Sequence, residues 1–203
     1  TPTWGDPASR PAGDWWSLAE MGGGRLGANG SHQIDLLRWW LGEFGAVTGV
    51  AKTVVPNRLD KATGQLWTAT ADDLTTFTAE LQNGALATVF MSGVARHNLG
   101  NHIQIFGSEG TILLSNEDEK LLVARAGEAY QDMSVGDPNA SLPSINSGIW
   151  NVSFVGLMQE FCASIREKRP LQAGATFADG LRNQIIMDAV IESWHTRRWV
   201  TIS

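Results

Sequence analysis

Cysteine is almost absent from this chain of 203 residues, which holds only Cys162. One thiol forms no intramolecular disulfide and supplies no Cys-x-x-Cys metal motif. The scarcity therefore favours a reducing compartment, and we predict a cytoplasmic protein. Cys162 itself lies between Phe161 and Ala163 in an amphipathic stretch, so we interpret it as a packed core residue and not as a nucleophile.

Positive charge and long apolar runs are also scarce. Lys and Arg total 15 against 21 Asp and Glu, which gives a net charge of −6, whereas a protein that binds nucleic-acid phosphates normally presents a basic face. No apolar run approaches the ~18 to 20 residues that a membrane-spanning helix needs. With 43% hydrophobic and 18% charged residues, the composition is that of an ordinary globular domain. We therefore expect no nucleic-acid partner and no membrane partner.

An initiator methionine and a nucleotide-binding fingerprint are missing as well. The chain opens with Thr1-Pro2-Thr3, so we expect a piece of a longer protein. A Gly-x-Gly-x-x-Gly motif after a strand is absent, and no predicted strand precedes the run Gly22 to Gly24. The His and carboxylate residues have no spacing that defines a metal site. The sequence thus predicts neither a cofactor site nor a metal site in these residues.

The spacing of the hydrophobic residues along the chain predicts the helices and strands. Residues 1–14 form an irregular lead-in, and a period of 3.6 predicts helices over residues 30–41, from about 151 to before Pro170, and from 176 onward. The last of these carries Leu181, Ile185 and Ala189 on its apolar face. A period of two predicts strands between the first two helices, with hairpins at Asn83-Gly84, as a type I′ turn, and at residues 107–110. Residues 127–148 are predicted to form a long exposed loop, and residues 199–202 a final strand.

This order of elements predicts the fold class. A helix, several antiparallel strands, two helices and a strand indicate an α+β fold in a single domain over residues 1–203. We expect a mostly antiparallel open β-sheet with the helices packed on one face. The uncovered face is then solvated or paired with another subunit.

The segment from Gly22 to Asp35 is the richest in chemical groups. A glycine run leads into the predicted helix, whose first turn holds His32, with Asn29 or Ser31 available to cap it. An imidazole at the positive end of a helix dipole is favoured in its neutral form, as a general base requires. Asp35 lies close enough to orient His32 or to pair with Arg38. On spacing alone, a structural histidine with a first-turn acid is the favoured interpretation.

Other polar and aromatic residues are further candidates. Trp15 and Trp16 can form an apolar platform for a sugar ring, or a hydrophobic cover for the first helix. Arg96 and His97 lie between the two hairpins and are candidates for a pocket. Together with Asn29 and Asp35, these residues form the predicted substrate-binding set.

The same segment resembles the C-terminal domain of the glucose-fructose oxidoreductase, inositol dehydrogenase and rhizopine-catabolism (Gfo/Idh/MocA) family. The matching residues are Gly22 to Gly24, Leu26, Gly30, His32, Asp35, Arg38, Trp39 and Gly42. The resemblance continues through Asn83-Gly84-Ala85, residues 107–111 and the C-terminal helices. It therefore covers nearly the whole chain.

The resemblance implies the substrate-binding and oligomerisation domain of an NAD(P)-dependent oxidoreductase, which transfers hydride between a sugar or polyol CH-OH group and a C=O group. His32 is then the catalytic acid/base residue. NAD or NADP is bound mainly by an N-terminal nucleotide-binding (Rossmann) domain that is not in this chain, so this fragment alone is expected to be inactive. The open sheet is then the surface of a homo-oligomer.

One departure from the family pattern keeps alternatives open. Ala28 stands where the family has an aspartate four residues before the histidine. A non-catalytic sugar-binding or scaffolding protein of the same fold is therefore the alternative to an enzyme. A dimerisation module is a third interpretation and is compatible with both.

Overall fold

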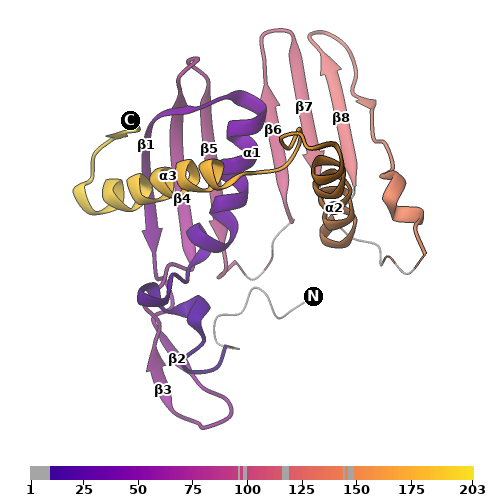
Figure 1. Cartoon of the computed structure of the whole chain (residues 1–203). Helices are drawn as coiled ribbons and strands as arrows, with labels where there is room; N and C mark the ends of the chain where they lie inside the picture. Colours follow the sequence, from indigo (N-terminus) through magenta and orange to yellow (C-terminus); the bar gives the residue numbers. More distant parts are fainter. Residues whose placement is uncertain (1–9, 96, 98–99, 116–118, 144, 146–148) are drawn as a thin grey trace. The chain divides into compact units, whose positions relative to one another are not determined.

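The computed structural model describes residues 10–95, 97, 100–115, 119–143, 145 and 149–203. The chain divides into two compact units, one of Thr1–Arg96 with Ala175–Ser203 and one of His97–Gly174 (Figure 1). Each unit has its own four-stranded sheet, whereas the sequence predicts a single sheet. The first sheet ends just after the pair Leu74 and Ser92, where Gly93 N still donates to the Asp73 carbonyl at 2.7 Å.

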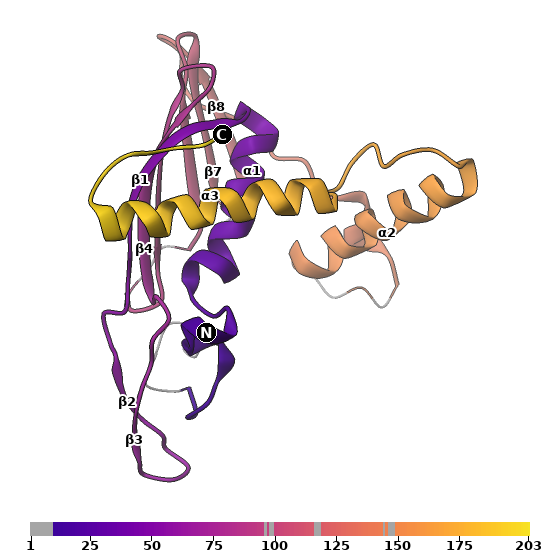
Figure 2. The ribbon, with the colours of Figure 1, turned by 60° about the vertical axis from the view of Figure 1, so that its left-hand side comes forward.

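The first unit is built on an antiparallel sheet in the order β10-β1-β4-β5. Its strands are β1 (Phe44–Lys52), β4 (Leu74–Leu81), β5 (Leu86–Ser92) and β10 (Val200–Thr201). Two helices, α1 (Ser31–Leu41) and α3 (Phe177–Thr196), lie on one face of this sheet (Figure 2). The predicted α+β fold with antiparallel strands is therefore confirmed. Of the predicted lead-in, residues 1–9 lie outside the described residues, and residues 10–14 contain neither helix nor strand.

The alternation of buried and more exposed residues along β4 shows which face of the sheet the helices cover. Thr75, Phe77, Ala79 and Leu81 are buried, whereas the residues between them are not. Phe77 packs in one core cluster with Ile34 of α1 and Val190 of α3. Because Ile34 is fully buried, it fixes the rotation of α1, and the exposed His32 lies on the opposite side of that helix.

The turn between β4 and β5 differs from the predicted type I′ turn. Gly84 has a φ of +86°, but Asn83 does not have a positive φ. Gly84 N donates to the Leu81 carbonyl at 2.9 Å, which is the pattern of a type I turn followed by a left-handed glycine. The Asn83 side chain is used elsewhere, since its Nδ2 donates to the carbonyl of Leu41 at 2.7 Å and so closes the end of α1.

The third helix begins as predicted but packs through a different face. Thr176 and Asp179 form a reciprocal capping box. Leu181 and Ile185 of the predicted apolar face are exposed, and the buried residues are Asn183, Ile186, Met187, Ala189, Val190 and Ser193. The polar Asn183 is buried because its Oδ1 accepts from Arg38 and its Nδ2 donates to Asp35, both of α1. The side of α3 that carries Asn183 therefore faces α1, and Leu181 and Ile185 are turned to the surface.

The second unit contains the predicted second hairpin and its neighbours. Its antiparallel sheet runs β6 (His102–Phe106), β7 (Gly110–Ser115), β8 (Lys120–Arg125) and β9 (Gln131–Asp132) in chain order. The predicted long loop over residues 127–148 therefore holds one short strand, and a 3₁₀ turn covers Pro138–Ser141.

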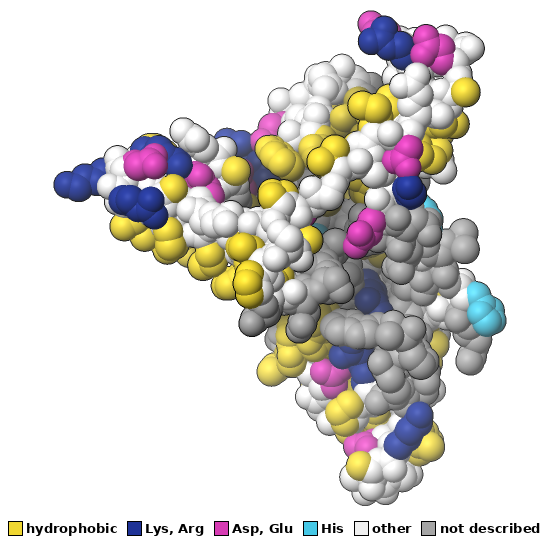
Figure 3. Space-filling view, turned by 90° about the vertical axis from the view of Figure 1, so that its right-hand side faces the viewer, with side chains coloured by type: hydrophobic (Ala, Val, Ile, Leu, Met, Phe, Trp, Pro, Cys, Tyr) yellow, Lys and Arg dark blue, Asp and Glu magenta, His cyan; other side chains and the backbone are white. Residues whose placement is uncertain are grey.

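The helix α2 (Ile149–Glu167) of the second unit has the predicted period, but its apolar stripe is not buried. Phe154, Phe161 and Ile165 are all exposed, and so is Cys162. The interpretation of Cys162 as a core residue is therefore wrong, because the helical period places it on this open stripe. On the face shown in Figure 3, hydrophobic side chains reach the surface in several places.

Candidate functional site

The helical segment that carries His32 begins earlier than the sequence predicts. It starts at Arg25, passes through one π-helical stretch, Leu26–Gly30, and continues as α1. His32 is therefore not in the first turn, and the predicted effect of the helix dipole on it does not apply. A π-helical stretch of this kind is often found at functional sites.

Neither predicted cap residue caps this helix. The Ser31 hydroxyl donates to the Gly27 carbonyl at 2.7 Å, and Asn29 Oδ1 accepts a hydrogen bond from Arg25 Nη1 at 3.0 Å. The start of the helix is satisfied from a distant loop instead, since Leu26 N donates to Asp72 Oδ2 at 3.0 Å.

Three polar residues follow one side of this segment. Arg25, Asn29 and His32 are separated by four and three residues, the spacing that brings side chains together on a helix. Asn29 and His32 are exposed, and Arg25 is half-buried. Burial lowers the pKa of Arg25, and the nearby positive charge of Arg10 lowers it further. We call these three residues the polar helix face.

Asp35 is placed in a structural network. Its Oδ1 accepts a hydrogen bond from Asn183 Nδ2 at 3.0 Å and lies 3.6 Å from Arg38 Nη1. Of the two roles that the sequence offers for Asp35, these contacts correspond to the pairing with Arg38.

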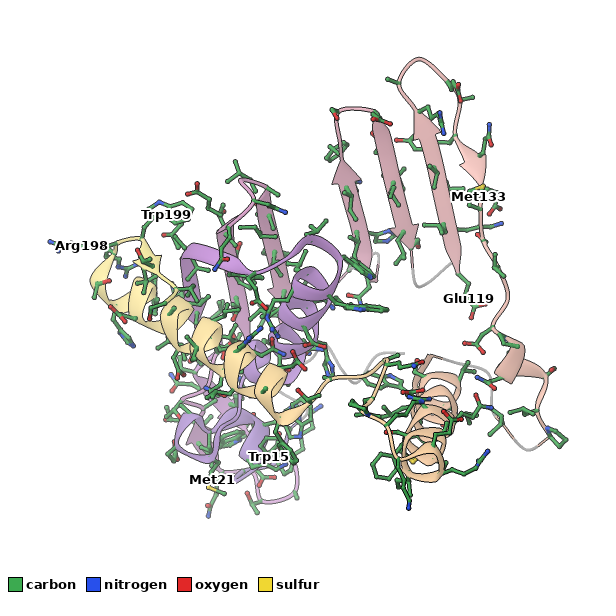
Figure 4. All side chains as sticks on the ribbon, turned by 45° about the horizontal axis from the view of Figure 1, so that its top comes forward. Trp15, Met21, Glu119, Met133, Arg198 and Trp199 are labelled. Atoms are coloured by element: carbon green, nitrogen blue, oxygen red, sulfur yellow. The ribbon has the colours of Figure 1, made fainter. Side chains whose placement is uncertain are left out.

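The two tryptophans lie just before the glycine run. Trp15 and Trp16 occupy a 3₁₀ turn, Trp15–Ser17, with ring centroids 4.9 Å apart. Gly24 N donates to the Trp16 carbonyl at 3.0 Å, which ties this turn to the start of the His32 helix. Trp15 lies near Met21 and far from Arg198 and Trp199 (Figure 4). With 47% of its surface exposed, Trp15 remains accessible.

The other two predicted binding residues are His97 and Arg96. His97 is exposed and belongs to the second unit. Arg96 lies outside the described residues.

A small polar cavity of about 30 Å³ lies beneath the start of the His32 helix. It has room for about one or two water molecules. Its lining residues are Arg10, Trp16, Ser17, Gly24, Arg25, Arg58, Asp72, Asp73 and Gly93. Arg58 comes from β2 (Asn57–Leu59), which pairs with β3 (Leu66–Thr68) in a two-stranded ribbon. Sequence reasoning missed the neighbouring Asp72 and Asp73, which we call the aspartate pair.

Both members of the aspartate pair accept several hydrogen bonds. Asp73 is buried and accepts from Val54 N at 2.6 Å, Val55 N at 3.0 Å and Arg58 Nη2 at 3.2 Å. Asp72 accepts from Leu26 N and from the Thr75 hydroxyl, and burial raises the pKa of Asp72. Two adjacent aspartates before a strand are the only sequence signal for this arrangement.

The glycine run does not fit a dinucleotide. A Cβ atom at Gly23 would lie 2.2 Å from the Trp15 carbonyl oxygen, and one at Gly24 would lie 2.1 Å from Asp72 Oδ1. These glycines therefore make room for the chain's own atoms and do not open a cradle for a pyrophosphate. Among the residues that the structure describes, no group of three His, Cys, Asp or Glu residues could hold a metal ion. No helix of that same part of the chain has the length and apolarity to cross a membrane.

The fold and the polar helix face define an α+β domain that presents polar side chains beside a glycine run, and this run is filled by the chain's own atoms. A sequence profile described as the GFO/IDH/MocA C-terminal domain matches residues 2–113. The chain belongs to this oxidoreductase family, as the glycine and histidine motif indicates.

Similar proteins and a similar solved structure support the assignment to this family. An uncharacterized oxidoreductase of Synechocystis, sll0816, is 26% identical over 94% of this chain and 53% of its own length. Levoglucosan dehydrogenase of Pseudarthrobacter phenanthrenivorans is 26% identical over 98% of the chain and 57% of its own length. A solved structure of levoglucosan dehydrogenase in complex with NADH and L-sorbose superimposes with a TM-score of 0.85, at 26% identity, over 100% of this chain and 57% of that one. The chain thus spans about half the length of these relatives.

Proposed function

We propose that the chain is the substrate-binding half of an NAD(P)-dependent oxidoreductase that acts on a sugar or polyol. The observation that carries this proposal is the polar helix face, with an exposed histidine, in a member of the GFO/IDH/MocA family. The structure of the relative with NADH and L-sorbose supports the same reaction class. The redox chemistry is supplied by the nicotinamide cofactor, which an N-terminal half would bind, and this fragment alone would be inactive.

In this proposal His32 holds and transfers the proton of the reacting hydroxyl group. A general acid or base acts through a hydrogen bond to the reacting oxygen, so an accessible imidazole is required. Asn29 and Arg25 would bind the neighbouring hydroxyl groups, and the exposed ring of Trp15 would pack on the C–H surface of the sugar.

A substrate panel on the native protein tests this proposal. Sugars, inositols and their keto forms are incubated with NAD(H) or NADP(H), and nicotinamide absorbance is followed. We expect turnover with at least one member of the panel. Cofactor binding without turnover for any member would contradict the proposal.

A second candidate is a non-catalytic sugar-binding or scaffolding protein of the same fold. Ala28 favours it, because alanine supplies no carboxylate to a proton relay at a position where the family resemblance places an aspartate. Sugar binding by calorimetry, in the absence of turnover, would favour this candidate.

We further propose a homo-oligomer that forms through the open face of the first sheet. Leu86 and Phe90 of β5 are 74% and 66% exposed, and Phe90 is paired with Thr76 of β4 on the face that the helices do not cover. Large exposed apolar side chains on an open sheet commonly mark an interface.

Phe90→Glu should dissociate this oligomer, because a carboxylate cannot be buried unpaired in an apolar interface. Sedimentation velocity at about 20 µM measures the effect, and Thr88→Ser on the same face is the mild control. Wild-type protein that sediments as a monomer would rule the proposal out.

A further inference from the structure

Asp72 contacts the start of the His32 helix at two points. Its carboxylate Oδ2 accepts from Leu26 N at 3.0 Å, and its main-chain carbonyl accepts from Arg25 N at 3.0 Å. These amides belong to the first turn, whose N–H groups have no partner within a helix. Asp72 thus supplies, from a loop distant in sequence, the cap that Asn29 and Ser31 do not provide.

The Asp72 carboxylate lies close to the start of the helix and is held there by neighbouring residues. Gly24 has a φ of +119°, and a Cβ atom there would lie 2.1 Å from Asp72 Oδ1, so only glycine allows the carboxylate to approach. The hydroxyl of Thr75, which is fully buried, hydrogen-bonds to Asp72 Oδ2. The carboxylate is therefore a fixed acceptor, set between the strand β4 and the helix.

We propose that Asp72 is a positioning residue that holds the polar helix face in register with the substrate. This inference rests on the proposed function, because that face is the proposed binding surface. Loss of the cap would let the first turn fray; Arg25 lies within it and Asn29 directly follows it. A displacement of about 1 Å in an active site can lower the rate by about 10²-fold.

Three variants of the native protein separate positioning from stability. Asp72→Ala removes the acceptor, whereas Asp72→Asn can place its amide oxygen where Oδ2 lies, so that it still accepts from Leu26 N and from the Thr75 hydroxyl. Asp73→Ala is the matched control, because Asp73 is also a buried carboxylate but caps Val54 and Val55 and pairs with Arg58. Its hydrogen bonds therefore support the β2–β3 ribbon, and it acts on Arg25 of the helix only as a nearby charge.

With a substrate from the panel, we expect Asp72→Ala to raise KM and to lower kcat/KM by about 10-fold to 100-fold. Asp72→Asn should restore KM to within about two-fold of wild type, since the hydrogen bond to Leu26 is retained. Asp73→Ala should lower the melting temperature without raising KM. An equal rise of KM in both alanine variants, or none in Asp72→Ala, would overturn the inference.

Hydrogen exchange gives a readout that needs no activity. Amides of residues 25–32 should exchange at least about 10-fold faster in Asp72→Ala, because the first turn opens more often, and at the wild-type rate in Asp72→Asn and Asp73→Ala. Unchanged exchange in Asp72→Ala would show that Asp72 does not hold the first turn, and would overturn the inference. If the panel finds no turnover in wild type, the proposed function fails independently of this result.

Discussion

His32→Ala should lower kcat/KM of the native protein by about 10² to 10⁴, the range that a general acid or base contributes. The imidazole lies on the exposed side of α1, opposite the fully buried Ile34. Removing it opens no core cavity, so the melting temperature should change by no more than about 2 °C. The loss would then report on chemistry and not on folding.

The chain offers a matched control in His195→Ala. His195 is exposed in the last turn of α3 and lies outside the proposed site, so steady-state kinetics should match wild type. Unchanged turnover in His32→Ala would remove this residue from the mechanism.

Local sequence patterns predict most of the helices and strands, but not the residue at which the His32 helix begins. Alternation along residues 74–92 and the 3.6-residue period after residue 149 are local properties, and the corresponding hairpin and helix are present. Gly27 and Gly30 weaken any helix signal before Ser31. The helix nevertheless begins at Arg25, because Leu26 is buried and Asp72, 46 residues from Leu26, accepts its amide hydrogen.

The aspartate pair could not be found from the sequence for the same reason. The partners of the pair lie in three separate segments: Leu26, the amides of Val54 and Val55, and Ser17, which is linked to the pair by Arg58. The period of α2 predicts a helix but not what covers its apolar stripe, and for this reason the prediction of a buried Cys162 is wrong. The sequence places Asn29 and His32 on one helical segment, but the long-range contacts that hold this segment cannot be read from local patterns.

Arg38→Met should lower the free energy of unfolding by about 2 to 4 kcal/mol, because removing this buried guanidinium leaves the carboxylates around it without their opposing charge. Only 5% of the Arg38 side chain is exposed. Its Nε and Nη2 bond both oxygens of Glu43 at 2.9 Å, and its Nη1 bonds Asn183 Oδ1 at 2.9 Å. It also contacts Asp179 at 3.3 Å. One side chain thus joins the end of α1, the start of β1 and the start of α3.

Arg182→Met is the matched control. Arg182 bonds the same Glu43 oxygen at 2.8 Å, but 59% of its side chain is exposed, so its loss should cost less than about 1 kcal/mol. Urea unfolding followed by circular dichroism measures both variants. Equal losses would show that the buried network adds nothing beyond a surface pair.

The dependence on pH gives a second test of the same network. The hydrogen bond from Arg38 lowers the pKa of Glu43 below its ordinary value. A carboxyl group with a lowered pKa stabilises the fold above its unfolded-state pKa, and this contribution is lost as the pH falls through the folded-state value. In Arg38→Met the Glu43 pKa returns toward 4.5, its ordinary value, so the difference in stability between wild type and variant should be largest near neutral pH and should shrink below about pH 4. A difference that stays constant down to pH 3 would mean that packing of the arginine stem, and not its charge, supplies the stabilisation.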